Sequence, residues 1–312
     1  MFVLREFFSL RAIYKIGGKG IMKKNKITLI MILFFFIGLL VLLYPAISSY
    51  YNEKVSTKAI FNYESLLENN PNQEKYQKMF EEAKIYNQKL LNLKEPLIEH
   101  DTIDGYKNIL NIDDTGMMGY LTINKIKVEL PIYHGTSQEV LGTSVGHLEG
   151  TSFPIGEKGT HAVLSAHRGL PSSKLFTDLD KLEIGDKFTL TILDKTFNYE
   201  VDKITIVSPK ELDELKIDKD SDYITLLTCT PYGINTHRLL VRGKRVEGNK
   251  KNTYISTEGY SVNKLIVMPL VALPIILTLF LVILFKPVKR NYKDMYIKEL
   301  KNKLNGRVYE KK

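Results

Sequence analysis

The chain has one cysteine, Cys229, at the end of a run rich in residues that favour β-strands, "SDYITLLTC". Arg238 follows nine residues later, at the start of a second such run, "HRLLVRGKRV". A thiol reacts as its thiolate, which a neighbouring cation favours, and an arginine can also donate to a developing oxyanion. This pattern suggests a nucleophile with an electrostatic partner. The alternative is that Cys229 is a small buried hydrophobic residue, the commoner role of a lone cysteine.

A nucleophilic thiol also needs a group that transfers protons near neutral pH, and histidine is the usual choice. His167 is the favoured candidate because it ends the apolar run "GTHAVLSAH". The competing histidines are His134, His147, His161 and His237. His237 is nearest to Cys229 in the sequence, but neighbours on a strand point to opposite faces. If Arg238 faces the thiol, His237 does not.

The elements that carry these residues are predicted to be short β-strands. The loop "TPYGIN", with turn signals at Pro231 and Gly233, would return the chain antiparallel and place Arg238 beside Cys229. Together with the candidate short helix "SSKLFTDLDKL", the strands predict a closed β-barrel. The expected strands are "MGYLTI" and "IKVELPIY" around a turn at Asn124–Lys125, "GTHAVLSAH", "KFTLTI" and "FNYEVDKITIV" around a turn at Asp194–Lys195, "SDYITLLTC" and "HRLLVRGKRV".

The region before the barrel is predicted to be helical. Over 50–93, Tyr76, Phe80, Ala83 and Leu90 recur at helical intervals after a turn at Asn70–Pro71. This indicates a helical stalk or hairpin. The next segment, Lys94 to Tyr106, is polar and irregular, and it is predicted to be a loop.

Two uncharged apolar runs of 21 residues, Ile27–Ile47 and Leu265–Phe285, are each long enough to span a hydrocarbon core of about 30 Å. Pro45 lies near the end of the first run, where a break in the helix costs little. The net charge of +9 comes from the chain ends. Residues 1–26 carry +6, residues 286–312 carry +7 and the intervening stretch carries −4, which argues against nucleic acid as a partner.

The distribution of lysine and arginine predicts the membrane orientation. Lys23, Lys24 and Lys26 precede the first run, and basic residues of 286–293 follow the second. Both termini are therefore expected in the cytoplasm, with residues 48–264 outside the cell. The first run is expected to be an uncleaved anchor, because it exceeds a typical signal-peptide core. Met22 is an alternative start to Met1.

Three ordered blocks resemble the sortases, the membrane-anchored transpeptidases of Gram-positive surfaces. The blocks are "GYLTINKIKVELPIYHGT", "GTSVGHLEGTSFPIGEKGTHAVLSAHRGLP" and "TLLTCTPYGINTHRLLVRGKR". The last block and the two apolar runs are most similar to the class C, pilus-building group. The resemblance implies a sortase-type β-barrel in which Cys229 is the nucleophile, His167 the acid/base and Arg238 the oxyanion or substrate donor. It also makes Thr228 a site neighbour, where the alternative is an ordinary strand residue.

The resemblance implies the activity of a cysteine transpeptidase. The enzyme is expected to cleave an LPxTG-like sorting signal through a thioester and to pass it to an amine. The amine is a pilin lysine or that of a cell-wall precursor, and the class favours the pilin.

The observations together predict a domain plan for the chain. The expected parts are a cytoplasmic N-terminus (1–26), a transmembrane helix (27–47), an extracellular stalk with a lid-like loop (48–105), the catalytic barrel (106–247), a linker (248–264), a second transmembrane helix (265–285) and a basic cytoplasmic tail (286–312).

One segment departs from the class pattern. Class C sortases usually carry an Asp-Pro-aromatic anchor over the cysteine, whereas this chain reads Glu95-Pro96-Leu97. We therefore predict a mobile segment and an accessible Cys229. No metal or other cofactor is expected. The rival interpretations are a cysteine hydrolase with water as acceptor and a non-catalytic surface scaffold.

Overall fold

The computed structural model describes residues 3–69, 71–247, 272, 276–277 and 300. The chain divides into two units, Met1–Leu42 with Ser261–Lys312, and Leu43–Tyr260. The barrel and all candidate site residues belong to the second unit. The second apolar run, 265–285, lies outside the described residues apart from three isolated positions.

The first helix, α1, spans Val3–Asn69 and contains the first apolar run. Pro45 lies inside this helix, which continues past it. A proline removes one backbone donor and crowds the preceding turn, but a helix can continue past it. Over Ile32–Asn69 the helix is long and apolar enough to cross a membrane, judged by length and composition.

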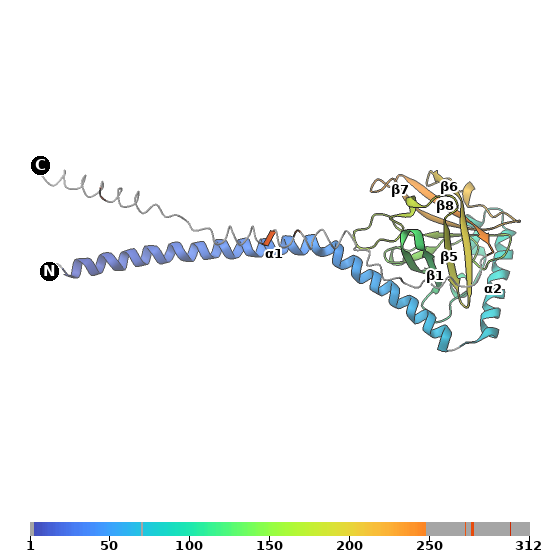
Figure 1. Cartoon of the computed structure of the whole chain (residues 1–312), viewed down its shortest axis with the longest axis horizontal. Coiled ribbons are helices and arrows are strands. Elements are labelled where there is room, and N and C mark those ends of the chain that lie inside the picture. Colours follow the sequence, from blue (N-terminus) through green and yellow to red (C-terminus); the bar gives the residue numbers. More distant parts are fainter. Residues whose placement is uncertain (1–2, 70, 248–271, 273–275, 278–299, 301–312) are drawn as a thin grey trace. The chain divides into compact units, whose positions relative to one another are not determined.

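The second helix, α2, spans Gln73–Leu91 and confirms the helical prediction after the turn at Asn70–Pro71. The Asn72 side chain caps it by accepting a hydrogen bond from the Lys75 backbone amide at 2.9 Å. Its apolar face is buried in the same core as the barrel interior, and the Phe80 and Phe197 rings lie 6.4 Å apart. Figure 1 shows α2 alongside the barrel strands.

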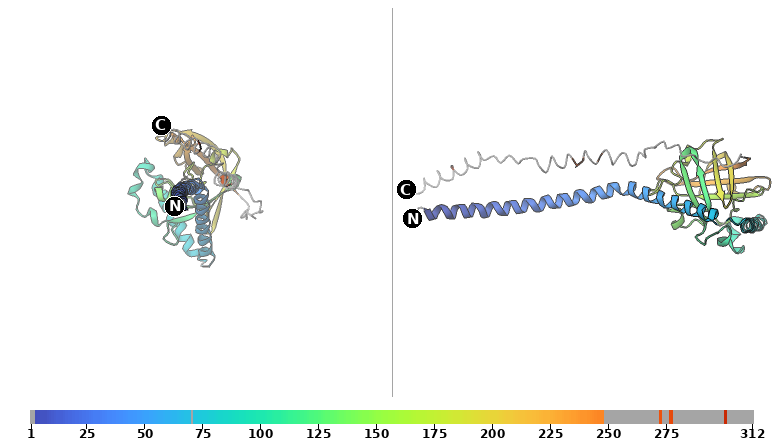
Figure 2. Two further views of the ribbon diagram at one scale, coloured as in Figure 1. Left: turned by 90° about the vertical axis from the view of Figure 1, so that its left-hand side faces the viewer. Right: turned by 60° about the horizontal axis from the view of Figure 1, so that its bottom comes forward.

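Eight strands close the predicted barrel in the order β1-β2-β3-β4-β7-β8-β6-β5. Figures 1 and 2 show the barrel from different sides. Alternating residues such as Phe188, Leu190 and Ile192 are buried in the core, as their period of two predicts. The strands are β1 (Met117–Ile123), β2 (Val128–His134), β3 (Val145–His147), β4 (Thr160–Ser165), β5 (Lys187–Ile192), β6 (Lys195–Val207), β7 (Asp222–Thr230) and β8 (His237–Val246).

The short elements differ most from the sequence prediction. Strand β3 was not predicted, because three residues, "VGH", are too few to show alternation. The segment predicted as a helix at 172–182 forms turns and a single 3₁₀ turn, η4. The remaining short helices are η3 (Asn124–Ile126), α4 (Gln138–Leu141), η4 (Leu179–Lys181) and η5 (Asp213–Leu215).

The segment Lys94–Tyr106 was predicted to be an irregular loop, and this is wrong. It forms α3 (Pro96–Glu99) and η1 (His100–Thr102), and η2 (Tyr106–Asn108) follows. Pro96 starts α3, where its missing amide costs nothing. Gly150 allows the segment to approach closely, because a Cβ there would lie 2.8 Å from the Leu97 Cα atom.

Leu97 packs against a cluster that we call the outer patch, made of Val163, Val207, Leu215 and Leu240 with Leu148 and Leu227 beside it. The patch lies on the outer face of the barrel, because the strand neighbours of its members, such as Ala162 and Leu226, belong to the interior core. The segment 95–102 therefore contacts the same barrel face as Leu227. Its mobility stays a prediction.

Candidate active site

Strands β7 and β8 place the cysteine and the arginine side by side. They pair antiparallel, with Cys229 directly opposite Arg238 and Thr230 directly opposite His237. Cys229 lies on the same barrel face as Leu227, two residues before it, and is partly exposed. Cross-strand partners share a face of the sheet, so the register places Arg238 on the face of Cys229 and His237 on the opposite face, in agreement with the prediction.

Strand β4 brings His167 to the same level. It runs parallel to β7 with Ser165 opposite Leu227, so two residues further along each chain put His167 level with Cys229. His167 itself lies just beyond the last residue of β4. The three residues singled out from the sequence thus meet at one end of the adjacent strands β4, β7 and β8.

The backbone around His167 is fixed on both sides. The Ala166 amide donates to the Leu227 carbonyl at 3.2 Å, and the Phe176 amide donates to the His167 carbonyl at 3.1 Å. The Thr228 hydroxyl donates to the Ala166 carbonyl at 2.8 Å. Thr228 is buried and, as the neighbour of Cys229 on the strand, points to the opposite face. It therefore supports the backbone before His167 and does not share the strand face of Cys229.

The ring of His167 and the guanidinium of Arg238 have few fixed contacts. The His167 Nε2 atom lies 3.4 Å from the Gln138 side-chain oxygen, on α4. Arg238 Nη1 donates to the backbone carbonyls of Asn235 at 3.3 Å and His237 at 3.1 Å. A guanidinium has five N–H donors, so Arg238 retains donors for an additional partner.

His134, His147 and His161, which competed with His167, have structural partners. His134 contacts the carbonyls of Gly116 and Ile109 at 2.8 and 2.7 Å, and burial lowers its pKa. His161 contacts the Lys216 carbonyl and the Thr225 hydroxyl at 2.8 and 2.7 Å, and burial lowers its pKa too.

His147 is the most deeply buried of the competing histidines. It is fully buried, stacks on Phe153 with centroids 5.1 Å apart, and its Nε2 atom lies 2.9 Å from the Ser152 carbonyl. Burial lowers its pKa to about 4. A group held neutral inside the core cannot transfer protons to a substrate, so His167 keeps the role of candidate base.

Sequence reasoning missed one residue near this site, Arg168. Its side chain is only 7% exposed, and its guanidinium bonds to Asp180 and Thr230. The sequence feature that could have identified Arg168 is its place directly after the candidate base, at the end of an apolar run. Buried arginines normally serve a specific partner, because an isolated buried charge is costly.

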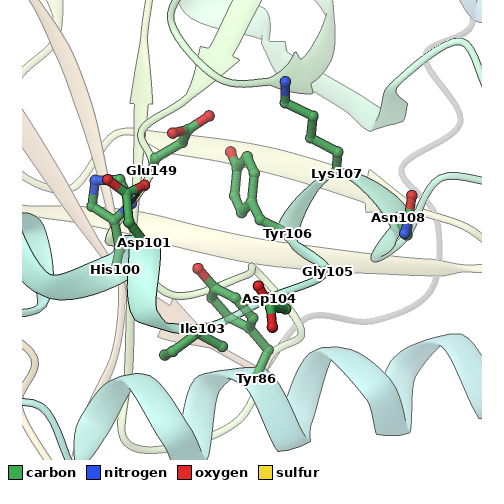
Figure 3. A pocket seen from close by; sticks show the side chains of 10 residues that line it. All are labelled: Tyr86, His100, Asp101, Ile103, Asp104, Gly105, Tyr106, Lys107, Asn108 and Glu149. Atoms are coloured by element: carbon green, nitrogen blue, oxygen red, sulfur yellow. Dashed lines mark ion pairs between the residues drawn. The ribbon is translucent and has the colours of Figure 1, made fainter.

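A separate cavity of about 330 Å³ lies between α2 and the segment that follows it (Figure 3). Its lining, which includes Tyr86, Tyr106 and Glu149, contains none of the three candidate site residues. In it, ligating atoms of His100, Asp101 and Glu149 lie within 4.8 Å of one another, close enough to share a metal ion. The sequence spacing gave no hint of this group, because Glu149 is remote from the other two.

Comparison with known proteins gives consistent matches. A family model described as the sortase domain matches residues 121–246. Sortase D of Bacillus subtilis is 33% identical over 131 residues, which are 41% of this chain and 63% of that protein. The chain thus spans slightly less than two thirds of this curated relative.

Solved structures match over a longer stretch. The crystal structure of sortase C1 from Streptococcus agalactiae is 50% identical, covers 62% of this chain and 100% of its own, and has a TM-score of 0.58. Clostridium perfringens sortase C with the C-terminal cell wall sorting motif is 46% identical, with the same two coverages and a TM-score of 0.55. The residues that the family model matches include β4, β7 and β8, the three strands that carry the candidate site.

Proposed function

This chain belongs to the sortase family of cysteine transpeptidases, and from that premise we propose that it cleaves a sorting signal of the LPxTG type and joins the released end to an amine. In this proposal Cys229 is the nucleophile, His167 the acid/base and Arg238 the oxyanion donor. The observation that carries the proposal is the shared level of these residues on β4, β7 and β8.

The first half-reaction makes a thioester. The thiol proton passes to His167, and the Cys229 sulfur attacks the carbonyl carbon of the scissile peptide bond, Thr–Gly in a signal of this type. Arg238 donates to the oxygen that becomes negative, which stabilises the transition state more than the substrate. His167 then protonates the leaving amine as the C–N bond breaks.

The second half-reaction reverses the roles. An incoming amine loses a proton to His167 and attacks the thioester carbonyl, and the Cys229 sulfur leaves. His167 alternates between base and acid, so it needs access to both the thiol and the amine. Its position just beyond β4, with few fixed ring contacts, supports this double role.

The substrates follow from the class. The resemblance to class C and the similarity to a sortase C solved with a sorting motif support a sorting-signal substrate. We propose a pilin lysine as the acceptor, with the amine of a cell-wall precursor as the alternative. Purified protein supplied with a sorting-signal peptide and both amines would distinguish the two, because the product masses differ.

Membrane anchoring completes the proposal. The apolar run within helix α1 supports an N-terminal anchor, and Lys23, Lys24 and Lys26, which precede this run, support a cytoplasmic N-terminus. We propose that the run 265–285 is a second span, so that both termini are cytoplasmic and the barrel is extracellular. Labelling of single cysteines introduced at Lys24 and Lys289 in a Cys229→Ala background, on intact cells, tests this. Accessibility of either site before lysis contradicts the topology.

The central test is peptide transfer. The full chain in detergent micelles is incubated with an LPxTG peptide and an added amine, and products are separated by mass. We expect transfer by the native chain and none by Cys229→Ala, whose small thiol-to-methyl change should leave the fold intact. Peptide cleavage without amine transfer, at every amine concentration, would indicate a hydrolase and refute the transpeptidase.

A further inference from the structure

Arg168 and Thr230 lie directly behind the candidate site. Each follows one of its residues: Arg168 follows His167, and Thr230 follows Cys229. Along a strand, successive side chains point to opposite faces, so Thr230 points away from the face of Cys229. Thr230 is buried, as is the side chain of Arg168. A bond between these two side chains therefore joins the histidine segment to the cysteine strand from the rear.

Three partners surround the Arg168 guanidinium. Its Nη1 atom donates to the Thr230 hydroxyl at 3.3 Å, and its Nη2 atom donates to the Asp180 carboxylate at 2.5 Å. Its Cζ atom lies 6.0 Å from the centre of the Tyr232 ring, in the loop after β7. One side chain thus contacts the end of β7, the turn that holds Asp180 and the β7–β8 loop.

The local backbone is built to admit this arrangement. Gly169 has a positive φ of 78°, and a Cβ there would lie 3.0 Å from the Tyr232 ring, so a glycine lets the ring approach. The Gly169 amide also donates to the Thr177 hydroxyl at 3.2 Å. The residues on either side of Arg168 are therefore fixed by backbone bonds, and its side chain is held between two loops and a strand.

The buried guanidinium is not fully satisfied, because its Nε atom has no hydrogen-bond partner among the described residues. A charged group with an unpaired donor is expensive to bury. Stability alone favours an apolar side chain at such a position. The planar guanidinium does, however, fix the relative positions of its two partners, because Nη1 and Nη2 donate to Thr230 and Asp180 at a set angle.

We propose that Arg168 is a positioning residue that sets the distance between His167 and Cys229 by clamping the end of β4 to Thr230. The inference rests on the proposed function, because positioning matters only if the two residues exchange a proton. Arg168 does not need to contact substrate. Its loss changes turnover through the geometry of the His167–Cys229 pair, and small errors in such geometry are costly.

Lysine is the informative replacement. Arg168→Lys keeps the charge and can reach one partner, but it loses the second arm of the fork. We expect kcat for peptide transfer to fall about tenfold with KM unchanged within about twofold, because the buried side chain lies behind the strand face that carries Cys229. Thr230→Val, which removes only the hydroxyl contact, should produce a smaller loss of the same kind. Arg242→Lys is the matched control, because Arg242 binds Asp202 away from the site.

A second readout separates positioning from simple stability. The rate of Cys229 alkylation by iodoacetamide is measured at pH 7 for the native full chain, Arg168→Lys, His167→Ala and the double variant. We expect Arg168→Lys to slow alkylation about fivefold and to add no further slowing in the His167→Ala background. The thermal midpoint of each variant is recorded, and rates are measured well below it.

The outcomes are distinct. Native turnover and alkylation in both Arg168→Lys and Thr230→Val overturn the positioning role while leaving the proposed function intact. If Arg168→Lys slows alkylation further in the His167→Ala background, Arg168 does not act through His167, and the positioning role is overturned. A loss of rate that only follows a lowered thermal midpoint shows a purely structural role and overturns it too. A native chain that transfers no peptide refutes the proposed function, and the inference falls with it.

Discussion

Cys229 lies directly opposite Arg238 across the β7–β8 pair, while His237, the neighbour of Arg238, lies opposite Thr230. This one-residue register decides which cation shares a face with the thiol. It also divides the end of the β7–β8 pair into two faces, with Cys229 and Arg238 on one face and Thr230 on the other. A shift of one residue would exchange these sides and remove the proposed site.

Replacement of Arg238 tests whether its role is charge or geometry. We expect Arg238→Lys to lower kcat by about 100-fold, because lysine keeps the charge but loses the planar donors that fit an oxyanion. Steady-state transfer of a sorting-signal peptide is the measurement. Arg242→Lys, four residues along the same face of β8, should stay near native values. Near-native kinetics for Arg238→Lys would mean that the residue supplies charge alone.

Leu97 offers a test of whether its segment restricts access to Cys229. The side chain packs on the outer patch beside Leu227, two residues before the thiol. Losing about 1 kcal/mol of apolar contact corresponds to a rate change of about fivefold. We therefore expect Leu97→Ala to speed alkylation of Cys229 by about that factor. Ile98→Ala is the control, because Ile98 is 66% exposed.

An unchanged alkylation rate would contradict a restricting role for Leu97. An alkylation rate unchanged by Leu97→Ala, and by deletion of residues 95–104, would agree with the mobile segment that the sequence predicts. It would show that the packing of Leu97 does not limit access to the thiol.

His147 should make the barrel sensitive to acid. Its pKa falls from 6.5 to about 4 on folding, because burial disfavours its charged form. Because the pKa is lower in the folded state, the contribution of neutral His147 to the free energy of unfolding is complete above pH 6.5 and is lost as the pH falls toward 4. The change is on the order of 3 kcal/mol, and His134 and His161 act in the same direction. The pKa of Asp222 is raised to about 6 by burial, so its contribution is lost as pH rises.

The comparison of two chains isolates the His147 contribution. Urea unfolding of the full chain and of His147→Gln is followed in detergent between pH 7 and 4. At pH 7 the variant should be less stable than the native chain, because glutamine lacks the ring that stacks on Phe153. Its free energy of unfolding should, however, depend less on pH. Parallel pH dependences for the two chains would show that His147 does not titrate in this range.

The sequence predicted the parts of the site that follow from strand periodicity. The runs ending at Cys229 and starting at Arg238, joined by a short loop with Pro231 and Gly233, indicate an antiparallel pair, and β7 and β8 form it. Alternation then places Arg238, and not His237, on the thiol face. His167 was harder to place, because its level depends on the parallel pairing of β4 with β7, which joins residues about sixty positions apart.

The errors share a physical cause, which is tertiary contact in segments with weak local pattern. The segment around Leu97 looks like a polar loop, yet Pro96 starts a short helix and Gly150 lets it pack closely. Strand β3 has only three residues, and its pairing with β2 and β4 defines it. The contacts of Arg168 involve Asp180, Thr230 and Tyr232, which no local spacing connects.

The most direct test of the account is to trap the thioester. The full chain is incubated with an LPxTG peptide and no added amine, quenched in acid, digested and analysed by mass spectrometry. The account predicts a peptide adduct on the fragment that holds Cys229, released by hydroxylamine, absent in Cys229→Ala and strongly reduced in His167→Ala. Peptide transfer that persists in Cys229→Ala, or an adduct on any other residue, would contradict it.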